Sequence, residues 1–199
     1  MNIAVLASGN GSNFEALVKA WREGVFSAPI RMLITDKEKA FARTRARKFD
    51  IPDLFIDPAA SASRDAFDLK LVDCLRDNGI DLVVLAGYMR ILSSHFVRSF
   101  NNRIVNIHPS LLPMFPGIGS IRKAFEAKVD NTGVTVHLVD EGVDTGPVIL
   151  KENVPILPGD TLETLEKRVH SVEHRLYPQA VKLLTESRYE VSGTMIRFL

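Results

Sequence analysis

This chain lacks the features that would place it in several large classes of protein. Its 199 residues include one cysteine, Cys74, so no disulfide can form within the chain, and we predict a reducing, cytoplasmic location. No apolar run approaches the ~20 residues of a membrane-spanning helix, so we expect no membrane partner. The formal net charge is only +1, without the basic excess of nucleic-acid-binding proteins, so we expect no nucleic-acid partner.

Targeting and metal-binding patterns are also missing. The apolar N-terminus has no basic segment and breaks at Ser8-Gly9-Asn10-Gly11, which is typical of a strand entering a loop rather than of a signal peptide. Asp140, Glu141 and Asp144 have no second acidic cluster at ligand spacing, and His108 belongs to no recognisable metal motif. We therefore predict no metal.

What the chain does contain is an alternation of strands and helices. Apolar runs without alternation at 3–7, 32–34 and 82–86 indicate strands buried on both faces, as in a parallel sheet. Between them, apolar residues recur at helical spacing: Phe14, Leu17, Val18 and Trp21, then Phe67, Leu71, Cys74 and Leu75. This order predicts an α/β fold, with a mostly parallel twisted sheet and helices on both faces.

The second half of the chain has a different pattern. Alternation at 134–138 predicts a half-buried strand, antiparallel to the others, and 148–150 predicts a neighbouring strand. A long helix is expected from near Asp160, with Glu163 closing a capping box. Its apolar face comprises Leu162, Leu165, Val169, Val172 and Leu176, and its opposite side carries Glu166, His170, Glu173 and Tyr177. No linker interrupts the chain, so we predict one domain over 1–199.

The loop at 8–13 follows the first strand and opens the first helix. Its glycines free backbone amides, and a helix N-terminus favours an anion. Phe14 occupies the third glycine position of the dinucleotide fingerprint, so a single phosphate fits better than a dinucleotide. A plain strand-to-helix turn, with Gly11 and a Ser12 cap, explains the same residues, and both interpretations stay open.

Asn106 and His108 are the strongest candidates for catalysis. They lie two apart in an apolar strand that ends before Pro109, so their side chains point to the same side. An amide can donate to a developing oxyanion, and an imidazole carries a proton near neutral pH. Asp144, in a glycine-flanked loop, can orient that imidazole. The alternatives are a satisfied buried histidine and a solvated acidic turn.

The other candidates are weaker. The segment Gly87-Tyr88-Met89-Arg90-Ile91-Leu92 follows a strand and can line the pocket of a flat ligand. Alternatively, Ile91 and Leu92 belong to the core and Arg90 is a surface charge. We interpret His137 as structural, on the polar face of its strand, and His95 and His174 as surface residues.

Four segments together closely resemble the phosphoribosylglycinamide formyltransferases, over nearly the whole chain: the loop 9–13, the run Asn106–Pro113, the turn Phe115-Pro116-Gly117 and the loop 139–147. The Asn-x-His pair with a downstream Asp is shared by folate-dependent formyltransferases of this fold. The Gly-Asn-Gly-Ser-Asn loop narrows the resemblance to the glycinamide ribonucleotide branch.

The resemblance implies an N-terminal Rossmann-like half, 10-formyltetrahydrofolate as co-substrate, and formylation of 5'-phosphoribosylglycinamide in purine synthesis. It implies Asn106, His108 and Asp144 as the catalytic residues. It implies Gly11, Ser12, Asn13 and Glu173 for the ribonucleotide. For the folate it implies Arg64, Met89, Arg90, Ile91, Leu92, Asp140, Glu141 and Val143. It also implies a cis bond between Leu112 and Pro113. Partners are expected to be small molecules, and monomer and homodimer stay open.

One position departs from the family pattern: Gly119 stands where a histidine is usual, which puts rate, substrate positioning or loop mobility in doubt. A non-catalytic folate or nucleotide binder therefore stays an alternative. A formyltetrahydrofolate hydrolase normally carries an extra N-terminal domain and a methionyl-tRNA formyltransferase a C-terminal RNA-binding domain. We expect neither, since the chain begins at its first strand and ends at Leu199. The broken glycine fingerprint argues against an NAD-dependent oxidoreductase.

Overall fold

The computed structural model describes all residues 1–199 around a seven-stranded sheet of order β3-β2-β1-β4-β5-β6-β7. Five strands pair in parallel: β1 (Ile3–Leu6), β2 (Ile30–Thr35), β3 (Asp53–Phe55), β4 (Leu82–Leu85) and β5 (Ile104–His108). Antiparallel pairing then adds β6 (Asn131–Leu138) and β7 (Val148–Pro155). The mostly parallel sheet with an antiparallel second half is confirmed. Sequence patterns did not predict β3 or the hairpin of β8 (Tyr189–Ser192) and β9 (Met195–Phe198).

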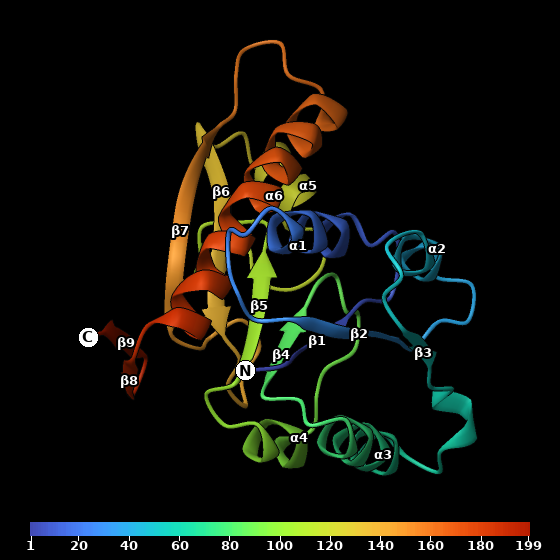
Figure 1. Cartoon of the computed structure of the whole chain (residues 1–199). Coiled ribbons are helices and arrows are strands. Elements are labelled where there is room, and N and C mark those ends of the chain that lie inside the picture. The colour runs from blue at the N-terminus through green and yellow to red at the C-terminus, as the bar shows by residue number, and fades with distance from the viewer.

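Helices cover both faces of the sheet (Figure 1). One face carries α1 (Ser12–Arg22), α2 (Phe41–Lys48), α5 (Ser120–Glu126) and α6 (Leu162–Glu186), whose apolar residues share one core cluster. The other carries α3 (Arg64–Asp77) and α4 (Ser94–Ser99), which share a second, and a short 3-10 helix, Pro58–Ala60, precedes α3. No helix combines the length and the apolar character that crossing a membrane requires.

The prediction that β6 is half-buried is wrong. Every residue of β6 after Asn131 is buried. Its flanks pair with β5 and β7. The loop after β5 also covers it, where the Leu112 amide donates to Thr135 Oγ1 at 3.1 Å. The alternation in sequence reflects hydroxyl and imidazole groups that have partners inside the protein.

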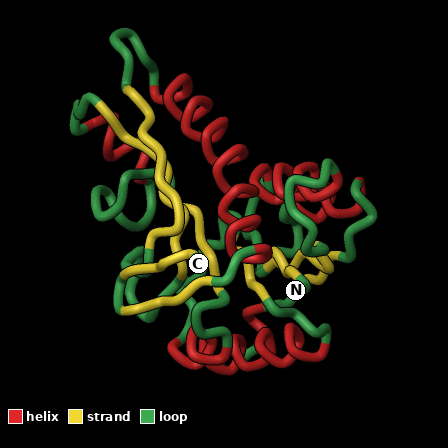
Figure 2. Tube along the Cα trace, turned by 60° about the vertical axis from the view of Figure 1, so that its left-hand side comes forward, coloured by secondary structure: helices red, strands yellow, loops and turns green.

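The start and the polar side of α6 also differ from the prediction. The helix begins at Leu162 after the cap residue Thr161, and Thr164 rather than Glu163 closes the capping box. Glu173 and Tyr177 are buried rather than solvent-facing. The Tyr177 hydroxyl lies 2.8 Å from the Leu85 carbonyl oxygen, so α6 directs polar groups at the sheet. The long strands β6 and β7 and the first turns of α6 project together from the rest of the molecule (Figure 2).

Candidate active site

A cavity of about 360 Å³ opens at the carboxyl ends of β4 and β5, where parallel sheets commonly bind ligands. Its lining brings together all three predicted catalytic residues and seven of the eight predicted folate residues: Asn106, His108, Asp144, Met89, Arg90, Ile91, Leu92, Asp140, Glu141 and Val143. The exception is Arg64, which lies at the first turn of α3, outside this lining, 3.8 Å from Asp65.

His108 ends β5, and its imidazole is buried with polar groups on both sides. Nδ1 lies 3.4 Å from Asp144 Oδ2. Nε2 lies 2.9 Å from the Phe115 carbonyl oxygen, which can only accept, so Nε2 carries a hydrogen. With the hydrogen on Nε2 directed at Phe115, Nδ1 is the ring nitrogen that faces the Asp144 carboxylate.

Asp144 is fixed by the turn that carries it and by three partners. Its backbone is left-handed, with φ 56°, and its side chain lines the cavity. The His137 imidazole, 3.6 Å away, lowers the pKa of Asp144 to about 2, helped by the Gly117 amide that donates at 2.8 Å and by His108, while burial opposes the shift. The Asp144 carboxylate is therefore ionised in the folded protein at neutral pH.

The stability of the protein in acid should depend on this carboxylate. Because the folded pKa of Asp144 is about 2 against an ordinary 3.8, its contribution to stability is complete above pH 3.8 and is lost as pH falls through about 2. That contribution is on the order of 2 kcal/mol. We expect Asp144→Asn to show a smaller loss of unfolding free energy than wild type across this window in urea titrations. The exposed Asp73→Asn is the control, and equal acid sensitivity of Asp144→Asn and wild type would contradict the prediction.

His137 belongs to this cluster, and its interpretation as a residue on the polar face of its strand is wrong. It is buried, and the β5–β6 register places it directly opposite Asn106. Its Nε2 lies 3.4 Å from Asn106 Nδ2, and its Nδ1 lies 2.8 Å from the Leu138 carbonyl oxygen. His137 thus supports both Asn106 and Asp144. No signal in the sequence reveals this, because the register of β6 on β5 is a property of the fold.

Apolar side chains also line the cavity. Met89, Ile91, Ile118 and Val143 line it with their side chains exposed, Ile118 by 84%. The alternative that Ile91 is a core residue is therefore wrong. Arg90 is half-buried rather than a surface charge, with its guanidinium 4.7 Å from the centre of the Phe67 ring. Exposed apolar side chains gathered around a few polar groups are typical of a site for a flat organic ligand.

The predicted phosphate loop lies at the N-terminus of α1. Gly11 is the cap residue, with φ 75°, and no side-chain cap bond forms, so the Ser12 cap of the alternative interpretation is absent. Asn13 Nδ2 donates to the buried Glu173 carboxylate of α6 at 3.2 Å. The same carboxylate, 2.7 Å from His170 Nδ1, raises the pKa of His170. The fold therefore joins two predicted ribonucleotide residues that are far apart in sequence.

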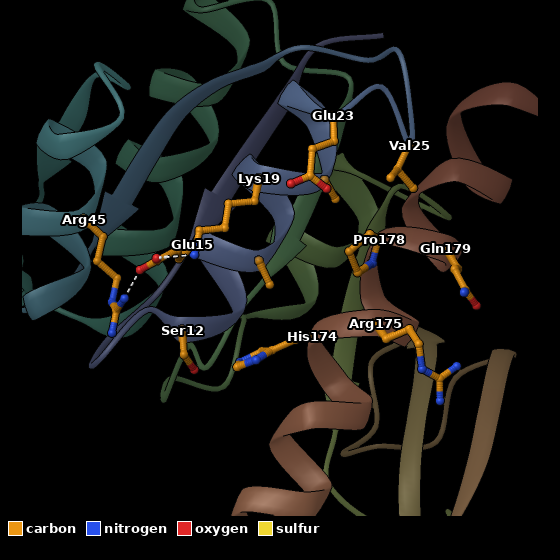
Figure 3. Close-up of a pocket in the computed structure, with 12 residues that line it drawn as sticks. Ser12, Glu15, Lys19, Glu23, Val25, Arg45, His174, Arg175, Pro178 and Gln179 are labelled. Carbon is orange, nitrogen blue, oxygen red and sulfur yellow. Dashed lines mark hydrogen bonds and ion pairs between the residues drawn. The ribbon is translucent and has the colours of Figure 1, made fainter.

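A second cavity, of about 590 Å³, lies between α1 and α6 beside this loop. Figure 3 shows Ser12 and His174 on neighbouring sides of it, and the Glu15 carboxylate between Arg45 and Lys19. His174 is half-buried here, and burial lowers its pKa, so its interpretation as a plain surface residue is wrong. His95 is exposed, as predicted.

An amide, an imidazole and an ionised carboxylate that converge on one cavity of an α/β sheet define an enzyme of the acyl-transfer class. The chain belongs to the formyl transferase family, whose model matches residues 1–181. It is 45% identical over 181 residues to the phosphoribosylglycinamide formyltransferase of Bacillus subtilis, covering 91% of this chain and 93% of that protein. The Escherichia coli enzyme of the same name is 39% identical over 96% of this chain and 90% of its own length.

A solved structure supports the same family. The crystal structure of glycinamide ribonucleotide transformylase 1 from Symbiobacterium toebii superposes with a TM-score of 0.97 at 46% identity, covering 100% of this chain and 94% of that one. Other relatives are much longer proteins. The trifunctional purine biosynthetic protein adenosine-3 of Drosophila pseudoobscura pseudoobscura is 46% identical over 92% of this chain, which spans only 14% of that protein. The fold and the family predicted from the sequence are confirmed.

Proposed function

We propose that this chain transfers the formyl group of 10-formyltetrahydrofolate to the amine of 5'-phosphoribosylglycinamide, giving the formylated ribonucleotide and tetrahydrofolate in purine biosynthesis. The observation that carries the proposal is the convergence of Asn106, His108 and Asp144 on one cavity, in a chain whose relatives bear this name. Formyltetrahydrofolate hydrolysis and ligand binding without catalysis are not favoured by those relatives.

The proposed chemistry follows from the hydrogen-bond donors of the cavity. The ribonucleotide amine attacks the formyl carbon, negative charge develops on the formyl oxygen, and the bond from that carbon to the folate nitrogen then breaks. Asn106 Nδ2 and the imidazolium of His108 are the donors for that oxygen. A preorganised donor of this kind contributes about 10²–10³ in rate.

Proton movement is assigned to the same cluster. The attacking amine must lose a proton and the leaving folate nitrogen must gain one. Asp144 is ionised, lines the cavity and contacts both imidazoles, so it stabilises positive charge on His108 while the formyl oxygen is negative. We propose that the Asp144 carboxylate also holds the water molecule that relays the proton between the two nitrogens.

The two substrates are assigned to two neighbouring regions. The backbone amides of Gly11, Ser12 and Asn13 and the side chains of Ser12 and Asn13 are proposed to hold the phosphate of the ribonucleotide at the positive end of α1, with Glu173 on the same substrate. The apolar lining at Met89, Ile91, Leu92 and Val143 is proposed to hold the folate ring, with Arg90, Asp140 and Glu141 as its polar edge. That Arg64 binds the folate remains a prediction.

Substitution of Gly11 should weaken the ribonucleotide site selectively. A Cβ at Gly11 would lie 2.6 Å from the Ala42 Cβ, and the φ of 75° strains any side chain, so the loop has to move. We expect Gly11→Ala to raise the KM for the ribonucleotide about tenfold or more, with the KM for the folate nearly unchanged. Gly9→Ala is the matched control, because a Cβ there meets nothing within 4 Å. Equal effects on both KM values would contradict the assignment.

A formyl-transfer assay tests the proposed function as a whole. Purified protein is mixed with 10-formyltetrahydrofolate, and folate absorbance is followed with and without the ribonucleotide. Turnover that requires the ribonucleotide supports the transferase. Turnover without it identifies a hydrolase, and binding of both ligands without turnover identifies the non-catalytic binder.

A further inference from the structure

The His108 imidazole has one more polar neighbour, which the mechanism above does not use. Ser120 is the first residue of α5, and its side chain is buried. Its Oγ lies 3.0 Å from His108 Nε2 and 2.8 Å from the Gly117 carbonyl oxygen. A hydroxyl placed between a backbone carbonyl and the ring of a proposed catalytic residue has a defined direction.

That direction follows from counting hydrogens. The Gly117 carbonyl oxygen has none, so the Ser120 hydroxyl donates its hydrogen there. The oxygen of Ser120 is then free to accept from His108 Nε2–H, which also faces the Phe115 carbonyl oxygen at 2.9 Å. One N–H is shared by two acceptors, and each bond of such a pair is weaker than a single bond. A formyl oxygen can therefore replace one acceptor while the other still holds the ring.

The segment around Ser120 also reaches Asp144. The Gly117 amide donates to Asp144 Oδ2, the same oxygen that faces His108 Nδ1. Gly119, with φ 75°, turns the chain immediately before Ser120, and a Cβ there would meet nothing within 4 Å. The position where the family pattern usually has histidine is thus a left-handed turn immediately before the buried hydroxyl that contacts His108.

We propose that Ser120 is a positioning residue for His108: its hydroxyl oxygen accepts from Nε2–H and so fixes the orientation of the ring, with hydrogen on Nε2. Ser120 is assigned no contact with substrate. The inference rests on the proposed function, in which His108 is a donor to the formyl oxygen. Loss of the hydroxyl should therefore slow the chemical step without weakening either substrate.

Three substitutions test this. Ser120→Ala removes the acceptor, Ser120→Cys keeps the volume but is a much poorer acceptor, and Ser120→Thr keeps the hydroxyl. We expect Ala and Cys to lower kcat about tenfold with both KM values within about twofold of wild type, and Thr to restore most of the rate. Ser93→Ala is the matched control, because Ser93 is a buried serine before a helix on the opposite face of the sheet. It should lower the melting temperature without changing kcat.

The opposite results overturn the inference. Wild-type kcat in folded Ser120→Ala or Ser120→Cys would show that the hydroxyl is not needed. KM values that rise in step with the loss of kcat would show that Ser120 shapes the cavity. Failure of folded Ser120→Thr to recover activity would contradict the requirement for a hydroxyl.

Nitrogen NMR of the histidine side chains separates this inference from the proposed function. If the wild-type protein transfers no formyl group, the proposed function fails. The NMR experiment then tests by itself whether Ser120 contacts His108. Ser120→Ala should then shift the Nε2 resonance of His108 and leave the resonances of His137 unchanged. An unchanged His108 resonance would disprove the contact whatever the activity.

Discussion

Asp144→Asn is expected to lower kcat by about 10³ while the protein stays folded. The substitution nearly preserves the shape of the side chain and removes its negative charge. In the structure that charge faces His108 Nδ1 at 3.4 Å and His137 Nε2 at 3.6 Å. An asparagine has no negative charge with which to stabilise positive charge on His108 or to hold the water that relays the proton. Its amide can also donate to His108 Nδ1, which would leave that nitrogen without a hydrogen.

Steady-state kinetics under saturation with both substrates measures this effect, with circular dichroism to check folding. Asp73→Asn is the control, because it makes the same chemical change at an exposed position on α3. A normal kcat in folded Asp144→Asn would show that charge at this position is not needed. The proposed roles for His108 and for the water relay would then have to be withdrawn.

His108→Ala and Asn106→Ala are each expected to lower kcat by about 10²–10³. Each removes one of the two donors proposed for the formyl oxygen. The negative charge that develops on this oxygen during the reaction is then less well stabilised. The KM for the folate should change little, because the apolar lining that holds its ring is intact. Together the two substitutions should cost less than the product of their separate effects, since they act on the same oxygen.

The fold should tolerate both changes. Removal of either side chain leaves buried partners unsatisfied at about 1–3 kcal/mol, against a total stability of about 5–15 kcal/mol for a typical domain. His95→Ala is the control, since His95 is exposed on α4. If either cavity variant keeps near-wild-type kcat in the formyl-transfer assay, the assignment of Asn106 and His108 is wrong.

Local patterns were sufficient for the elements that build the site. The apolar runs at 3–7 and 82–86 correspond to β1 and β4, and the Asn-x-His spacing places both side chains on one cavity, as period two in a strand requires. Errors occurred where a polar residue was assumed to face water. Tyr177 and Glu173 looked like the solvent side of α6, but both have partners that belong to distant segments, Leu85 and Asn13.

The sequence by itself determined the alternation of strands and helices, the parallel character of the first half and the residue types of the proposed catalytic cluster, because these depend on periodicity and on local turn chemistry. Only the tertiary structure decided which groups meet. The register of β6 on β5 sets His137 against Asn106 and Asp144, and the turn at Gly119 sets Ser120 against His108. These contacts join segments that come together in space only when the sheet is paired, so no local pattern contains them.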